Sequence, residues 1–155
     1  MKFWDTSAVI PLLVSEPHRD RLLALLEEDG TMIVWWGTPL ECMSAIARRE
    51  RQGHLRTEAS TQALERLRAL QLAWQEITPS TPVRGAMQRL LRVHPLRTAD
   101  ALQLAAAVVA AEHEPAGLDF VSLDNRLNVA AQKEGFNVVR PYAAERSTRS
   151  DQIPR

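Results

Sequence analysis

Short apolar runs of strand length alternate with longer amphipathic segments of helix length, and this alternation constrains the fold more than any other feature of the chain. The apolar periodicity predicts five strands, at residues 2–4, 32–36, 74–77, 120–123 and 137–140. It predicts helices between them, at residues 6–14, 19–28, 38–52, 57–72, 82–93, 99–111 and 125–134. Strands that alternate with helices favour a parallel sheet covered by helices. The predicted fold class is therefore an α/β sandwich with a mostly parallel central sheet.

Polar residues suggest where several of these helices begin. Thr6 or Ser7, Thr38 and Thr98 each precede a helical segment and are predicted N-caps. Glu41 stands three residues after Thr38, the spacing of a capping box. The helices 38–52 and 57–72 are separated by a short stretch that contains Gly53, so we predict a helical hairpin that projects from the sheet.

Length and composition fit one globular domain. The chain has 155 residues, and we predict a single domain over residues 1–141 followed by a flexible C-terminal tail over residues 142–155. The only cysteine is Cys42, which suits a reducing compartment. No apolar run approaches the ~20 residues that a membrane helix needs, so we expect a cytoplasmic protein without membrane contact. The formal net charge of +0 gives no overall attraction to nucleic acid.

Four acids occupy comparable positions on this predicted scaffold. Asp5 and Asp124 each follow a strand, Glu41 opens the helix after the second strand, and Asp100 lies in the first turn of an apolar helix. The carboxyl ends of parallel strands line one edge of a sheet, and ligands bind there. We therefore expect the four carboxylates to share one pocket.

Each acid also has a simpler structural interpretation. Asp5 and Asp124 could act only as helix caps, and Glu41 could act only as the capping-box partner of Thr38. Asp100 is harder to explain in this way, because it lies on a helix with apolar residues on nearly every side and a charge there needs a partner. The joint arrangement of the four acids favours a shared function.

Clustered carboxylates without histidine or cysteine favour Mg²⁺ or Mn²⁺ as the bound metal ion. Like charges held close together repel, and a cation relieves that repulsion. A cation held by carboxylates can activate water and stabilise the charge of an in-line displacement at phosphorus. The reaction class suggested by the four acids is hydrolysis of a phosphodiester bond.

Four segments of the chain resemble the motifs of the PIN-domain ribonucleases. They are, in the order in which the family has them, FWDTSAVI at 3–10, TPLECMSA at 38–45, LRTADALQLAAA at 96–107 and FVSLDNRL at 120–127. The third is the most specific, and the resemblance covers about residues 1–141. Most small single-domain members that resemble this chain are VapC-like toxins of type II toxin–antitoxin systems. The implied fold is a PIN-like α/β/α sandwich.

The resemblance implies a Mg²⁺- or Mn²⁺-dependent endoribonuclease in which Asp5, Glu41, Asp100 and Asp124 are the catalytic and metal-binding residues. It further implies a VapB-like antitoxin that silences the enzyme, an RNA substrate, and a homodimer. The hydroxyls of Thr6 and Ser122 are expected to orient carboxylates or water without binding the metal themselves. Asp119 competes with Asp124, but it precedes its strand and should lie at the opposite edge of the sheet.

Two further residues are candidates for substrate contact. Arg97 stands three residues before Asp100 at the rim of the predicted pocket, and its planar guanidinium suits a phosphate. Asn125 follows Asp124 directly and could add a polar contact.

Two other protein classes do not fit the sequence. A haloacid-dehalogenase-like phosphatase needs an aspartate where Ser7 stands, and a response-regulator receiver needs a lysine on a late strand, whereas the only lysines are Lys2 and Lys133. Two alternatives remain open: a PIN nuclease of RNA maturation, and a catalytically inactive PIN module that binds RNA or protein. A short antitoxin reading frame just upstream of the gene would favour the toxin.

Overall fold

The predicted parallel sheet is present in the computed structural model, which describes residues 1–141. Five strands form it within these residues: β1 (Lys2–Trp4), β2 (Met32–Trp35), β3 (Gln75–Ile77), β4 (Asp119–Val121) and β5 (Asn137–Val139). They lie in the order β3-β2-β1-β4-β5, and every neighbouring pair is parallel. The prediction of an α/β/α sandwich is confirmed, and the sheet is parallel throughout. The predicted tail, residues 142–155, lies outside the described residues.

Side chains of the central strands point alternately into two hydrophobic cores, as the pleat of a strand requires. On β1, Phe3 belongs to one core and Trp4 to the other, and both are fully buried. Phe3 stacks on Phe120 of β4, with ring centroids 5.6 Å apart. The burial of both faces explains why these strands are continuous apolar runs in the sequence.

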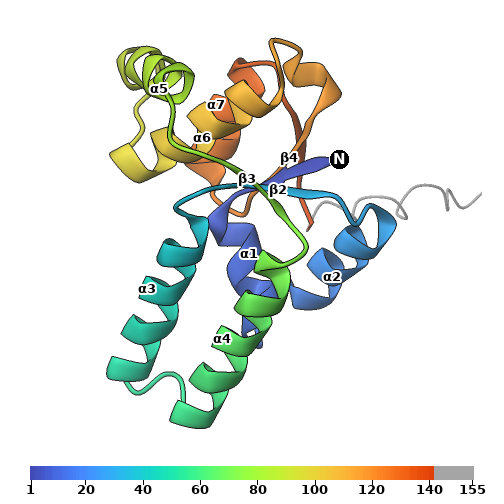
Figure 1. Ribbon diagram of the computed structural model, residues 1–155, viewed down its shortest axis with the longest axis vertical. Coiled ribbons are helices and arrows are strands. Elements are labelled where there is room, and N and C mark those ends of the chain that lie inside the picture. The colour runs from blue at the N-terminus through green and yellow to red at the C-terminus, as the bar shows by residue number, and fades with distance from the viewer. Residues whose placement is uncertain (142–155) are drawn as a thin grey trace, which may run out of the picture.

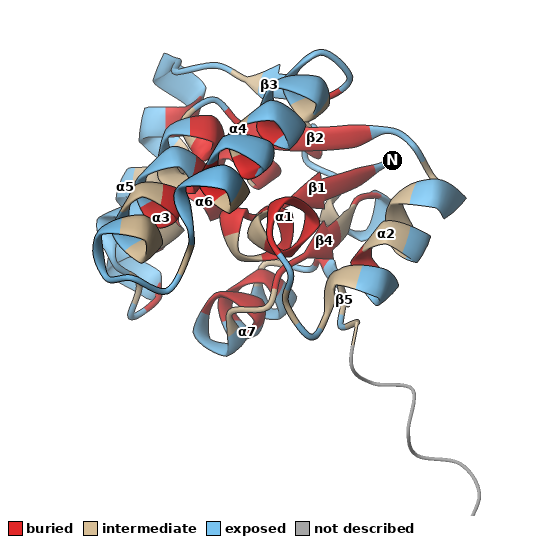
Figure 2. Cartoon of the chain, turned by 90° about the horizontal axis from the view of Figure 1, so that it is seen from below, coloured by how far each residue is buried: buried red, intermediate tan, exposed pale blue. Residues whose placement is uncertain are grey.

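Helices cover both faces of the sheet (Figures 1 and 2). One core is closed by α5 (Thr81–Val93), α6 (Thr98–Ala110) and α7 (Asn125–Lys133). The other is closed by α1 (Thr6–Leu13), α2 (Arg19–Glu28), α3 (Thr38–Arg51) and α4 (Thr57–Gln71). The short 3-10 helix η1 (Pro115–Gly117) precedes β4. Figure 1 shows α3 and α4 side by side and projecting from the sheet, as the predicted hairpin should.

Three of the predicted helix caps are wrong. The N-cap of α1 is Asp5, whose side chain accepts a hydrogen bond from the Ser7 amide, so neither Thr6 nor Ser7 is the cap. The N-caps of α3 and α6 are Gly37 and Arg97, and neither helix has a side-chain cap. Thr38 does not cap because its hydroxyl is turned inward, where it accepts a hydrogen bond from the side chain of Gln103. Thr98 is instead the first residue of α6, one position after the cap.

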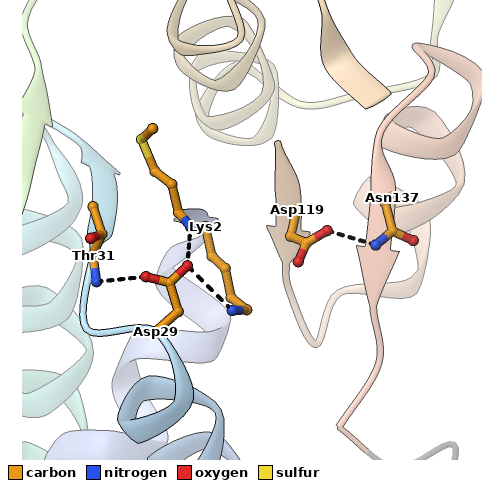
Figure 3. Close-up of polar contacts among 6 residues, drawn as sticks. Lys2, Asp29, Thr31, Asp119 and Asn137 are labelled. Atoms are coloured by element: carbon orange, nitrogen blue, oxygen red, sulfur yellow. Dashed lines mark hydrogen bonds and ion pairs between the residues drawn. The ribbon is translucent and has the colours of Figure 1, made fainter. Parts of the chain in front are cut away.

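The two edges of the sheet carry different polar groups. At the amino-terminal edge, Asp29 pairs with the chain's amino group, with Lys2 and with the Thr31 amide (Figure 3). Asp119 lies at the same edge, where it accepts a 2.6 Å hydrogen bond from Asn137. Asp5 and Asp124 follow β1 and β4 and so lie at the carboxyl-terminal edge. Asp119 is therefore separated from them by the length of β4.

Within the described residues, none of the helices has the length and apolar character needed to cross a membrane.

Candidate active site

Asp5 is held rigidly at the carboxyl-terminal end of β1. Its side chain is only 4% exposed, and its amide donates to the Val121 carbonyl at the end of β4. Three donors reach Oδ2: the Ser7 amide at 3.1 Å, the Ser7 hydroxyl at 2.5 Å and the Ser122 hydroxyl at 3.1 Å. Burial nevertheless raises the pKa of Asp5, and the negative charge of Asp100 adds to the rise, while the hydrogen bonds from Ser7 and Ser122 oppose it.

The Ser7 and Ser122 hydroxyls also fix the loop that carries Asp124. The Leu123 amide donates to Ser7 Oγ at 2.9 Å, and the Asp124 amide donates to Ser122 Oγ at 3.0 Å. The Ser122 side chain is completely buried. The segment after β1 and the segment after β4 are thereby joined through two hydroxyl groups.

Glu41 lies in the first turn of α3 and is held by residues of two other helices. Gln103 Nε2 on α6 donates to Glu41 Oε1 at 3.3 Å, and the Thr6 hydroxyl on α1 lies near enough to favour the charged form of the Glu41 carboxylate and so to lower its pKa. Burial raises the pKa of Glu41, with further contributions from the charges of Asp5 and Asp100; the hydrogen bonds of Thr6 and Gln103 act in the opposite direction.

Asp100 lies in the first turn of α6 and is partly exposed. Burial raises its pKa first, and the charge of Asp124 raises it further. The nearby guanidinium groups of Arg97 and Arg126 lower the pKa but do not cancel the rise. Both arginines are exposed, so they border the acids on the solvent side.

The charge of Asp124 acts on Asp100, and the Asp124 side chain caps a helix. It is the N-cap of α7, and its Oδ1 accepts a hydrogen bond from the Leu127 amide at 2.9 Å. Asn125, the next residue, is exposed at the start of the same helix. The simpler structural interpretations of Asp5 and Asp124 as caps are therefore correct descriptions of their backbone role, and they coexist with the electrostatic contact to the other acids.

The arrangement brings Asp5, Glu41 and Asp100 into mutual electrostatic contact, with Asp124 at the side of Asp100. Within residues 1–141, no three acid, histidine or cysteine side chains are gathered closely enough to form a metal-binding group as they stand. The chemistry of the donors still fits a divalent cation. They are oxygen ligands only, and three have a raised pKa because burial and mutual repulsion disfavour the charged form.

Comparison with known proteins agrees with this geometry. The model of the PIN domain family matches residues 2–133. The chain belongs to the PIN domain family. The resemblance stated from the four sequence motifs is thereby confirmed, and it assigns the chain to a family of nucleases that generally use divalent metals.

Solved structures with a similar fold include a chain of a toxin–antitoxin complex. A toxin–antitoxin complex from Klebsiella pneumoniae has a chain that is 19% identical, with a TM-score of 0.63 and coverage of 92% of this chain and 98% of that one. FitAcB from Neisseria gonorrhoeae gives the same identity and TM-score, with coverage of 92% and 99%. FitAB bound to an IR36 DNA fragment is 17% identical, with a TM-score of 0.59 and coverage of 91% and 95%. At these identities the likeness establishes the fold. No curated protein significantly matches this chain.

Sequence reasoning missed three residues around these acids. Ser7 is a predicted helix cap in the sequence, whereas in the structure its hydroxyl donates to Asp5. Arg126 lies two residues after Asp124 within the fourth motif, and that position was a usable signal for a basic residue near the acids. Gln103 had a weaker signal: it is the one polar residue in the apolar stretch after Asp100.

Proposed function

We propose that this PIN domain is a Mg²⁺- or Mn²⁺-dependent endoribonuclease and the toxin component of a VapBC-type toxin–antitoxin pair. The observation that carries the proposal is the electrostatic coupling of Asp5, Glu41, Asp100 and Asp124 at one edge of the sheet. Three of these acids are held with raised pKa values. A structure that only needed helix caps would gain nothing from placing them together, because their mutual repulsion destabilises it.

The four acids would bind the cation through their carboxylate oxygens. The hydrogen bonds of Ser7 and Ser122 converge on Asp5 Oδ2, so Oδ1 is the oxygen that we assign to the cation. Glu41 and Asp100 would supply further oxygens to the cation, and Asp124 would complete the set from the side of Asp100. When bound, the divalent cation polarises the phosphodiester group and stabilises the charge that develops during an in-line displacement by water.

The exposed arginines supply the positive charge that a phosphate backbone needs. Arg97 and Arg126 both act on Asp100, so their guanidinium groups lie near the proposed cation. We assign them to the phosphates that flank the scissile bond, where a planar guanidinium can donate two hydrogen bonds to one phosphate. Local charge of this kind is consistent with RNA binding by a chain whose formal net charge is +0. Asn125, exposed beside Arg126, is proposed as a further polar contact.

The partner proposal rests on the fold neighbours. Two of them are described as a toxin–antitoxin complex and as FitAcB, and both match nearly the whole length of this chain. We propose a VapB-like antitoxin as the cognate partner, a homodimer as the toxin's own assembly, and the cytoplasm as the place of action.

The test is cleavage of a panel of single-stranded and structured RNAs by purified wild type and by Asp100→Asn, each in Mg²⁺, in Mn²⁺ and in EDTA. We expect wild type to cut at least one RNA with metal only, and Asp100→Asn to remain folded and lose the activity. Substitution of an exposed acid far from the site, Glu58→Gln, is the matched control and should cut like wild type.

Two results would contradict the proposal. Cleavage that persists in EDTA would mean that the chemistry does not use a cation. RNA binding without cleavage by folded wild type, in both metals, would support a catalytically inactive binding module instead.

A further inference from the structure

The side chain of Gln103 is 1% exposed, although it carries an amide with two donors and an acceptor. Burying such a group in an apolar helix is costly unless its hydrogen bonds are made. Its Nε2 lies 2.8 Å from Thr6 Oγ1, 3.2 Å from Thr38 Oγ1 and 3.3 Å from Glu41 Oε1. The two N–H hydrogens of one buried amide are thus shared among three acceptors on α1 and α3, while Gln103 Oε1 has no hydrogen-bond partner among the described residues.

We propose that Gln103 is a positioning residue that sets the orientation of Glu41 in the cation site. The inference deepens the proposed function and rests on it, because the purpose of the orientation is cation binding. Gln103 itself faces Glu41 only through a donor group and is assigned no contact with the cation or with RNA.

The direction of the hydrogen bonds follows from the chemistry of the partners. An ionised carboxylate only accepts, so the amide must present Nε2 and not its oxygen to Glu41. Gln103 Nε2 also donates to the Thr6 hydroxyl, and this occupies a lone pair of Thr6 Oγ1. Gln103 therefore bonds Glu41 directly, and it also bonds the hydroxyl of Thr6, the residue that follows Asp5.

The position of Gln103 on its helix makes this link effective. It stands three residues after Asp100, so both side chains lie on the same face of α6. The network consequently ties Glu41 on α3 to the helix that carries Asp100, with Thr6 beside Asp5 as the third attachment. A purely structural role, in which Gln103 only fills space between α1, α3 and α6, predicts that an unbranched apolar side chain of similar length would serve as well.

The experiment compares Gln103→Met with Gln103→Glu, using Leu104→Ala as the control. Methionine keeps the length and removes the donors, whereas glutamate keeps the shape and replaces donors with acceptors. Leu104 is the next residue on α6 and is fully buried in the core that α5, α6 and α7 close. Leu104→Ala therefore destabilises the same helix without removing a hydrogen bond of Gln103. The probe is Mn²⁺ alone, titrated calorimetrically into each folded protein without RNA.

We expect Gln103→Met to weaken Mn²⁺ binding by about 10-fold, the lower range for loss of an outer-shell partner, and Gln103→Glu to weaken it at least as much. Leu104→Ala should lower the unfolding temperature and leave the Mn²⁺ affinity unchanged. Raising Mn²⁺ to saturation should restore most of the RNA cleavage of Gln103→Met. Wild-type affinity in Gln103→Met would overturn the inference while leaving the proposed function intact.

A second measurement tests the Gln103–Glu41 contact without metal, so that failure of the inference can be distinguished from failure of the proposed function, which a wild type that binds no Mn²⁺ would refute. Gln103→Met, Glu41→Ala and the double variant form a cycle of denaturant unfolding in EDTA. We expect Gln103→Met to destabilise the wild-type background more than the Glu41→Ala background, because its direct partner is missing in the latter. Additive effects of the two substitutions would show that Gln103 does not hold Glu41, and would overturn the inference.

Discussion

Ser7→Ala is the substitution whose cost follows most directly from the structure. The Ser7 hydroxyl donates to Asp5 Oδ2 at 2.5 Å and accepts from the Leu123 amide at 2.9 Å. Alanine removes a hydrogen bond to a charged group, worth about 1.5–3 kcal/mol, and leaves a partly buried N–H without its partner, which costs roughly 1–3 kcal/mol. Alanine also gains up to about 0.5 kcal/mol in helix propensity on α1.

The net expectation for Ser7→Ala is a loss of about 2–4 kcal/mol, because the two costs share one hydroxyl and the loop can relax in part. For a chain of this size that corresponds to a fall in the unfolding temperature of roughly 5–15 °C. The assay is thermal and urea unfolding followed by circular dichroism in EDTA, so that bound metal does not contribute. Ser44→Ala on the exposed face of α3 is the control and should change the free energy of unfolding by less than about 0.5 kcal/mol. If Ser7→Ala and Ser44→Ala have the same unfolding temperature and urea midpoint, the Ser7 hydroxyl does not join the segments after β1 and β4 as described.

Three further predictions concern charge and packing. The raised pKa of Asp100 means that the folded protein binds its proton more tightly than the unfolded chain, so metal-free stability falls as pH rises through that pKa. Asp100→Asn should therefore unfold at a higher temperature than wild type in EDTA at neutral pH, and in saturating Mn²⁺ wild type should unfold at the higher temperature. A lower unfolding temperature for Asp100→Asn in EDTA would contradict the predicted direction of the effect. The pKa of Glu134 is lowered, mainly by its hydrogen bond to Arg89 and also by His94. Ionised Glu134 therefore stabilises the fold at pH values above its unfolded pKa, and this stabilisation is lost as the pH falls through its folded pKa. Glu134→Gln should lower the free energy of unfolding at pH 7 and flatten its fall towards acid in urea titrations; an unchanged slope would contradict the linkage. A Cβ on Gly37 would lie 2.6 Å from Trp35 Nε1, so Gly37→Ala should cost about 1–3 kcal/mol, and wild-type stability would show that the indole moves freely.

The sheet could be predicted from the sequence because both of its faces are buried. Strands such as β2 are continuous apolar runs, and a parallel order follows from the helices between them. The edge that carries Asp5 and Asp124 follows from strand direction alone, and the same reasoning separates Asp119 from them. These features depend on local pattern and topology, which a single sequence contains.

The absence of a cap at Thr38 and the hydrogen-bond network could not be predicted, because they depend on which residues meet across the fold. Thr38 has the right type and spacing for a cap, yet Gln103 of a distant helix engages its hydroxyl. The local preference of threonine for capping competes with a buried amide that needs acceptors, and the buried amide prevails. Ser7 was likewise assigned to its own helix, whereas its partners are Asp5 and the segment after β4.

The central claim, that the carboxyl-terminal edge of the sheet holds a divalent cation, is tested most directly by crystals soaked in Mn²⁺ and measured at a wavelength where manganese scatters anomalously. The account predicts an anomalous peak within about 2.5 Å of carboxylate oxygens of Asp5 and of at least one of Glu41 and Asp100, and no such peak at this edge in crystals of Asp5→Asn. A well-diffracting wild-type crystal in saturating Mn²⁺ without a peak there, or with its only peak at the opposite edge near Asp29 and Asp119, would contradict it.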